Sequence, residues 1–144
     1  MTSEQKIIPI WFSIATIILL IWNLMGIVNF FQHLTITDEA ILAMPENQRE
    51  LYSNFPLWTI FAFALAVFGG SCGSLALLFK MKIAHPIFIA SLIGIVVQMS
   101  HSLNIAGGMG EDGAWVILRT FLLIVVGVFA IWLSKYSITK NWIK

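Results

Sequence analysis

The sequence predicts an all-α protein, a bundle of four transmembrane helices with both chain ends on the inner side. Of its 144 residues, 59% are hydrophobic and 10% are charged, and its mean hydropathy is +0.91, which is typical of integral membrane proteins. Four apolar stretches each approach the roughly 20 residues that cross a bilayer, and none alternates like a barrel strand. One integral membrane domain, residues 1–144, is expected, with spans at about residues 7–31, 57–79, 87–103 and 114–133.

The distribution of charge predicts the orientation. Lysines precede the first stretch, separate the second from the third, and follow the fourth, at Lys6, Lys80, Lys82, Lys135, Lys140 and Lys144. The two other connections carry mostly carboxylates, so the positive-inside rule assigns both chain ends to the cytoplasm. The first apolar run is too long for a cleaved signal peptide, and we expect it to be a retained helix.

The first stretch has one polar face and leads into a long connection. Its polar and small residues share a helix face or flank it, at Ala15, Trp22, Asn23, Gly26, Asn29 and His33. Polar groups avoid lipid, so this face is expected to point inward. The connection, 34–56, is predicted to form two short amphipathic helices over the outer end. Thr35 and Asp38 have capping spacing ahead of the first, and Pro45 starts the second. A solvated acidic loop is the alternative.

The second stretch carries a stripe of small residues. The stripe consists of Ala62, Ala66, Gly69, Gly73 and Ala76, which fall on one narrow line of a helix. Small residues let two helix backbones approach closely in lipid, so the stripe predicts a packing surface. We expect it to contact the first or third transmembrane helix of the same chain. A contact with another subunit, in a homo-oligomer or with another membrane protein, is the alternative.

The last two stretches add a second polar face and one arginine. Pro86 is expected to open the third helix, on which five residues gather on one side: Ser91, Gly94, Gln98, His101 and Ser102. A glycine-rich turn at 107–113 leads into the fourth helix, where Arg119 lies about 6 Å deeper than the interfacial Trp115. Arg119 can extend its side chain toward the membrane surface.

Together these positions predict a polar vestibule in the outer half of the membrane. The candidate solute-binding residues are Asn23, Asn29, His33, Gln98, His101 and Arg119. Amide and imidazole groups suit a neutral polyhydroxylated or amide-bearing solute, and Arg119 suits an anion. The alternatives are hydrogen bonds between helices for the amides, contact with lipid headgroups for the histidines, and a phospholipid or Glu111 or Asp112 as the partner of Arg119.

The sequence favours no enzyme class, cofactor, metal or nucleic-acid partner. His33 and His101 are predicted at similar depth on two helices, as axial haem ligands would be, but no other haem-binding signature accompanies them. For a metal site, no pair of candidate ligands has the i, i+4 spacing that places two side chains on one helix face. No serine, nor the lone Cys72, has an identifiable base and acid beside it. The glycine-rich turn lacks the lysine of a phosphate-binding loop and carries two carboxylates.

Several segments resemble a known group of proteins. They are the residues Trp22-Asn23-Leu24-Met25-Gly26, the segment Met44–Arg49 with Tyr52, Pro56 and Trp58, the segment Ala62–Gly70, and the lysine-rich end with Trp142. The resemblance spans nearly the whole chain and is to a family of small, mostly uncharacterised bacterial inner-membrane proteins with four transmembrane helices, often automatically labelled sugar transporter. It implies the four-helix fold and a bacterial inner-membrane location.

Two functions therefore follow as expectations. The first is binding or transport of a small, sugar-like polar solute through the outward-facing vestibule. The second is a non-transporting accessory or assembly role, in which the small-residue stripe and the outer loop recognise a membrane-protein partner. In both, the lipid bilayer is the immediate surrounding of the chain.

Overall fold

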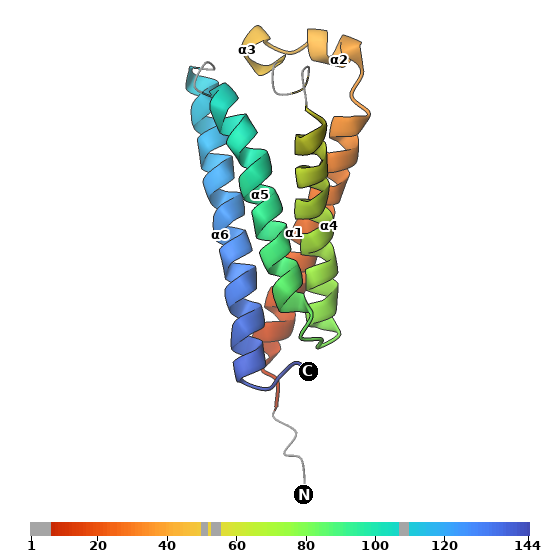
Figure 1. The fold of residues 1–144 in the computed structure, drawn as a ribbon, viewed down its shortest axis with the longest axis vertical. Helices are drawn as coiled ribbons and strands as arrows, with labels where there is room; N and C mark the ends of the chain where they lie inside the picture. Colours follow the sequence, from red (N-terminus) through yellow and green to blue (C-terminus); the bar gives the residue numbers. More distant parts are fainter. Residues whose placement is uncertain (1–6, 50–51, 53–55, 107–109) are drawn as a thin grey trace, which may run out of the picture.

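The protein is a bundle of four long helices, with two short helices at one end (Figure 1). The computed structural model describes residues 7–49, 52, 56–106 and 110–144. All regular secondary structure in these residues is helical. The helices are α1 (Ile10–Leu34), α2 (Asp38–Leu42), α3 (Glu46–Arg49), α4 (Leu57–Leu78), α5 (Ala84–Ala106) and α6 (Glu111–Thr139). Helices α1, α4, α5 and α6 are long and apolar enough to cross a membrane, which confirms the predicted helical class of multi-pass membrane protein.

Helices α5 and α6 extend beyond the apolar runs that predicted them. Helix α5 begins at Ala84, so Pro86 lies within its first turn, where a missing N–H costs no hydrogen bond. Helix α6 continues to Thr139 through polar residues, and within it Ser137 Oγ donates to the carbonyl of Leu133 at 2.6 Å, so this buried hydroxyl has its partner inside the helix. In the predicted glycine-rich turn, residues 107–109 lie outside the described part, and α6 already begins at Glu111.

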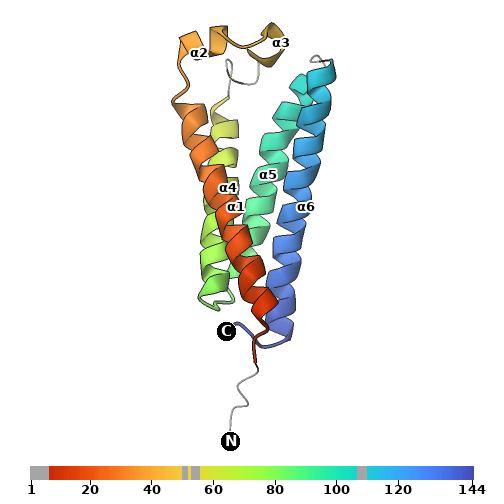
Figure 2. The same ribbon diagram turned by 180° about the vertical axis from the view of Figure 1, so that it is seen from behind.

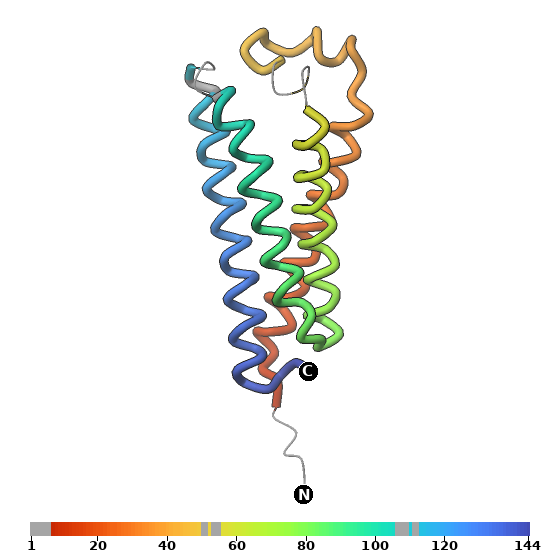
Figure 3. The backbone as a smooth tube through the Cα atoms, viewed as in Figure 1, coloured from red at the N-terminus to blue at the C-terminus, as the bar shows by residue number. Residues whose placement is uncertain are grey.

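Helices α1 and α4 form one pair, and α5 and α6 form the other. The two pairs diverge toward one end of the bundle (Figures 1 and 2). Helix α4 packs along both α1 and α5, and α5 also packs along α6. The first turn of α1 and the residues after α6 lie together at one end, here called the closed end. Helices α2 and α3 lie at the opposite end, here called the open end, as the tube in Figure 3 also shows.

The apolar core is concentrated at the closed end. Its buried members are Phe12, Leu19, Ala76, Leu77, Ala84, Phe88, Ala130, Leu133 and Ile143. Ile143 follows α6 and is only 1% exposed, so the chain after this helix fills the base of the bundle. Trp142 packs against α1, with ring centroids 5.7 Å from Trp11 and 5.5 Å from Phe12. These contacts hold α1 near α6 at this end.

Backbone hydrogen bonds join the residues after α6 to the connection between α4 and α5. Lys80 and Asn141 have positive φ values of 60° and 58°, and each reverses the chain after its helix. Beyond these residues, the Lys82 N–H donates to the Lys144 carbonyl at 2.7 Å, and the Lys144 N–H donates to the Lys80 carbonyl at 2.8 Å. Backbone hydrogen bonds therefore stabilise the closed end in addition to the packing of its apolar side chains.

The small-residue stripe of α4 lies against α5. A Cβ on Gly94 of α5 would come within 2.8 Å of the Ala62 carbonyl oxygen and 2.9 Å of the Ala66 backbone nitrogen. At the next turn, Ser91 Oγ donates to the Ala66 carbonyl at 2.6 Å, which two helices can achieve only at close range. Gly73, farther along the stripe, faces the ring of Phe88. The stripe therefore serves as packing surface within the chain.

A second face of α4 receives α1. Gly70 lies directly against the carboxamide of Asn23, and Gly26 of α1 lies against the side chain of Val67. The Asn23 Nδ2 donates to the Leu19 carbonyl at 2.8 Å and lies 3.4 Å from Ser74 Oγ. Asn23 thus contributes to helix packing, which was the alternative expected for the amides.

Candidate functional site

The open end contains two adjoining cavities between the helix pairs. The cavity nearer α2 and α3, here called the end cavity, has a volume of about 310 Å³. The deeper one, here called the middle cavity, has a volume of about 270 Å³. The two cavities adjoin each other, because five residues line both of them: Asn29, Phe63, Gln98, Met99 and Arg119. The volumes are near the lower limit for small-molecule sites in proteins.

Gln98 is a buried polar residue that lines both cavities. It projects from α5 and is only 7% exposed. Within residues 7–49, 52, 56–106 and 110–144, it makes no hydrogen bond. The Gln98 amide atoms are not among the fully enclosed unpaired atoms of the described residues, so they remain accessible from the cavities, where water or a polar ligand can complete their hydrogen bonds.

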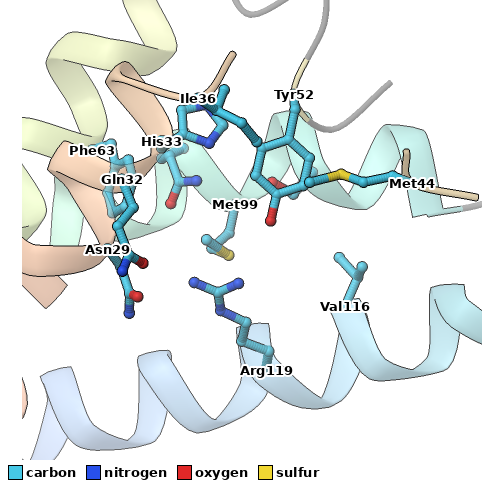
Figure 4. A pocket seen from close by; sticks show the side chains of 12 residues that line it. Asn29, Gln32, His33, Ile36, Met44, Tyr52, Phe63, Met99, Val116 and Arg119 are labelled. Carbon is cyan, nitrogen blue, oxygen red and sulfur yellow. The ribbon is translucent and has the colours of Figure 1, made fainter. Parts of the chain in front are cut away.

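Arg119 supplies the positive charge of the site. Figure 4 shows its guanidinium projecting from α6 into the end cavity, toward Met99. No aspartate or glutamate is among the described residues that line either cavity. The expected pairing of Arg119 with Glu111 or Asp112 involves side chains outside the described ones. The described walls therefore present hydrogen-bonding groups and a cation.

The end cavity is covered by the segment that holds α2 and α3. Ile36, Met44 and Tyr52 of this segment line the cavity, and the Tyr52 ring lies 5.1 Å from the ring of His33, centroid to centroid (Figure 4). The His33 ring also packs edge-on against Phe63 of α4, at 6.1 Å. His33 thus links the cover to the helices below it.

Local hydrogen bonds shape the covering segment. Thr37 caps α2 by accepting a hydrogen bond from the Ala40 N–H at 3.2 Å, so the cap predicted from the spacing of Thr35 and Asp38 is wrong. Thr35 instead ends α1, where both its backbone N–H, at 3.0 Å, and its hydroxyl, at 2.8 Å, donate to the Phe31 carbonyl. Arg49 of α3 then donates from Nη2 to the Leu42 carbonyl at 2.9 Å, which ties α3 to the end of α2.

The cavities unite most of the predicted solute-binding residues. The end cavity is lined by Asn29, His33, Gln98 and Arg119, and the middle cavity by Asn23, Asn29, Gln98 and Arg119. His101 lines neither cavity. Its ring packs edge-on against Trp58 of α4, with centroids 5.7 Å apart, because the polar face of α5 is wide enough to divide between α4 and the cavities.

Other lining residues were not identified from the sequence. Gln32 lies one turn from Asn29 and beside His33, so its helical spacing was a usable signal. Tyr52 and Met44 reach the end cavity only because their segment folds over it, which no local pattern indicates. At the closed end, His85 of α5 forms a hydrogen bond with Ser134 of α6 at 3.0 Å, another polar contact that the sequence left unassigned.

The site offers recognition groups of several kinds. Amide, imidazole, phenol and guanidinium groups converge from three long helices and the cover. Such groups bind polar ligands by hydrogen bonds and charge. Among the described residues, no three histidine, cysteine, aspartate or glutamate side chains are grouped to hold a metal ion.

Comparisons with known proteins add no assignment to this geometry. The chain matches no protein-family model, no curated protein and no solved structure. The site is therefore interpreted from its residues and their arrangement.

Proposed function

We propose that the protein is a bacterial inner-membrane protein that binds a small polar solute in the end cavity. The observation that carries this proposal is the buried amide of Gln98, which lines the cavity and has no hydrogen-bond partner among the described residues. Asn29 and Arg119 border the same space from the two outer helices of the bundle. A solute with several hydroxyl or amide groups, such as a sugar, would satisfy these side chains together.

The charge distribution supports an outward-facing cavity. Lys80, Lys82, Lys140 and Lys144 belong to the closed end, where the chain reverses and its last residues pair with the α4–α5 connection. The positive-inside rule favours the cytoplasm for that end and the periplasm for α2 and α3. In this orientation, the proposed ligand reaches the site from the outer side of the membrane.

The packed core supports binding in an outward-open conformation. The side chains of Phe12, Leu77, Leu133 and Ile143 are at most 2% exposed and fill the closed end below the cavities. A transport cycle would require this core to separate, so we propose binding as the primary activity and transport as its extension. The accessory role loses part of its basis, because the small-residue stripe is occupied by α5 and is not available to a partner.

The test is equilibrium binding of radiolabelled glucose, maltose and N-acetylglucosamine to the protein in phosphatidylcholine nanodiscs. We expect saturable binding of at least one of them. Gln98→Leu should weaken it about tenfold, because a buried hydrogen bond to the ligand is lost. Asn104→Leu is the matched control, since Asn104 is an exposed amide on the same helix that lines neither cavity.

Two results would contradict the proposal. One is the absence of saturable binding for every solute of the panel. The other is an equal loss of binding in Gln98→Leu and Asn104→Leu, which would indicate a site elsewhere. Uptake into proteoliposomes then separates a carrier from a binding protein, because only a carrier moves the bound solute across the membrane.

A further inference from the structure

The middle cavity differs from the end cavity in its walls and in its opening. Apolar side chains from α1, α5 and α6 dominate its lining: Trp22, Met25, Ile95, Leu122 and Leu123. Met25 of α1 is 59% exposed and Leu122 of α6 is 47% exposed, although both line the cavity. The middle cavity therefore reaches the surface of the bundle between α1 and α6.

This opening exists because the described parts of α1 and α6 pack closely only near the closed end. There, Trp142 and Tyr136 contact Trp11, with ring centroids 5.7 Å and 6.2 Å apart. Toward the open end, the two helices diverge (Figures 1 and 2). The opening lies at the level of the middle of both helices, where a membrane-spanning helix is surrounded by acyl chains.

Arg119 lies where the two cavities meet. It lines both of them, as do the amides of Asn29 and Gln98. Among the described lining residues it is the only group with a permanent charge, and no carboxylate opposes it. The complementary ligand therefore carries a negative group near Arg119 and an apolar part that follows the walls of the middle cavity.

We propose that this site also takes an anionic amphiphile, which enters sideways from the bilayer between α1 and α6, a route separate from the outer one used by a water-soluble solute. The amphiphile's phosphate or carboxylate head binds Arg119, Gln98 and Asn29, and its hydrocarbon chain occupies the middle cavity and extends into lipid between Met25 and Leu122. This inference depends on the proposed function and extends it, since it adds a second ligand class to the same polar site.

The head and the hydrocarbon chain of such a ligand contribute differently to its binding. A chain that moves from lipid into an apolar cavity exchanges one hydrocarbon environment for another and gains little free energy. The head, in contrast, exchanges the membrane surface for a fixed guanidinium and two amides. The chain therefore determines the route of entry, and the head determines selectivity.

The test uses hexadecyl phosphate that carries a photoactivatable diazirine in the middle of its chain. The wild-type protein in phosphatidylcholine vesicles is irradiated with this probe, and the labelled residues are mapped by mass spectrometry. We expect labelling at Met25 and Leu122 that excess hexadecyl phosphate suppresses. Excess hexadecanol, which lacks the charge, and inorganic phosphate, which lacks the chain, should leave the labelling unchanged.

Two matched pairs of variants locate the effect. Arg119→Gln should reduce the suppressible labelling at least about tenfold, since a charge-assisted hydrogen bond is lost. Lys135→Gln removes a charge from the same helix outside both linings and should not reduce it. Leu122→Trp should block the opening, whereas Leu118→Trp, at a 56% exposed position outside the linings, should not.

The outcomes separate this inference from the function on which it depends. Uniform labelling of the lipid-facing residues would overturn the inference. So would an equal reduction of labelling in a test variant and its control, that is, in Arg119→Gln and Lys135→Gln or in Leu122→Trp and Leu118→Trp. Suppression by hexadecanol would overturn the anionic head, and suppression by inorganic phosphate would overturn entry with a chain. If the sugar binding sensitive to Gln98→Leu persists while the cavity is not labelled, the polar-solute site stands and only the amphiphile is refuted.

Discussion

Gly94 is a position at which a single added methyl group would meet the backbone of a neighbouring helix. A Cβ at this site would lie 2.8 Å from the Ala62 carbonyl oxygen and 2.9 Å from the Ala66 backbone nitrogen. Backbone atoms of a helix cannot move aside separately, so Gly94→Ala must push α4 and α5 apart. That movement would also weaken the 2.6 Å hydrogen bond from Ser91 Oγ to the Ala66 carbonyl.

The magnitude follows from opposing contributions. Overpacking costs about 1–3 kcal/mol, and a weakened hydrogen bond between membrane helices costs about 0.6 kcal/mol. The higher helix propensity of alanine returns at most about 1 kcal/mol. With the full alanine gain, we therefore expect Gly94→Ala to lower the free energy of unfolding by about 0.6–2.6 kcal/mol.

Gly127→Ala provides a matched control on α6. Its Cβ would also meet an atom at 2.8 Å, but that atom is Leu92 Cδ1, the end of a flexible side chain that can rotate away. Steric trapping in bicelles, which measures the free energy of unfolding directly, should find Gly127→Ala within about 0.5 kcal/mol of the wild type. A Gly94→Ala protein as stable as the wild type, or a Gly127→Ala protein destabilised to the same extent, would refute the reasoning.

Three further predictions concern stability and use the same measurement. Gln98→Leu should leave the free energy of unfolding unchanged or raise it by about 1 kcal/mol, because it removes a buried amide that lacks a partner among the described residues; a clear loss would identify Gln98 as a structural residue. Ile143→Ala should lower it by about 2–5 kcal/mol, because a side chain that is 1% exposed leaves a cavity in the core. Leu118→Ala, at a 56% exposed position, is its control and should change little. Ser91→Ala should cost about 0.6 kcal/mol through loss of its hydrogen bond to Ala66, and no change would indicate that this bond contributes nothing.

Much of the fold was predictable because it depends on local properties of the chain. Apolar length predicted four long helices, since lipid offers no partner to an open backbone group. Helical periodicity placed the small residues of 62–76 on one line and Asn29 and His33 on one face of the first span. The ends of the helices were less predictable, because apolar length marks only the part of a helix that lies in lipid, and α6 continues beyond it through polar residues to Thr139.

The composition of the site was predictable only in part. Asn29 and Gln98 were expected on inward faces, and Arg119 was a candidate ligand-binding residue near the membrane surface; all three line both cavities. His101 shared the helical face of Gln98 in the sequence, yet it packs against Trp58, because a face wider than one contact can serve two neighbours. Tyr52 carries no periodic signal and reaches the site through the fold of its connection.

The sequence by itself determined that the chain forms apolar helices, where the first and third spans have their polar faces, and which face of α4 permits close approach. These are properties of one helix at a time. Only the tertiary structure decided that the stripe of α4 receives α5, and that α1 and α6 meet at the closed end and diverge toward the open end. The physical reason is that cavities arise where helices fail to pack. That depends on contacts such as Gly94 against Ala62 and Ile143 within the core, which join residues far apart in the chain.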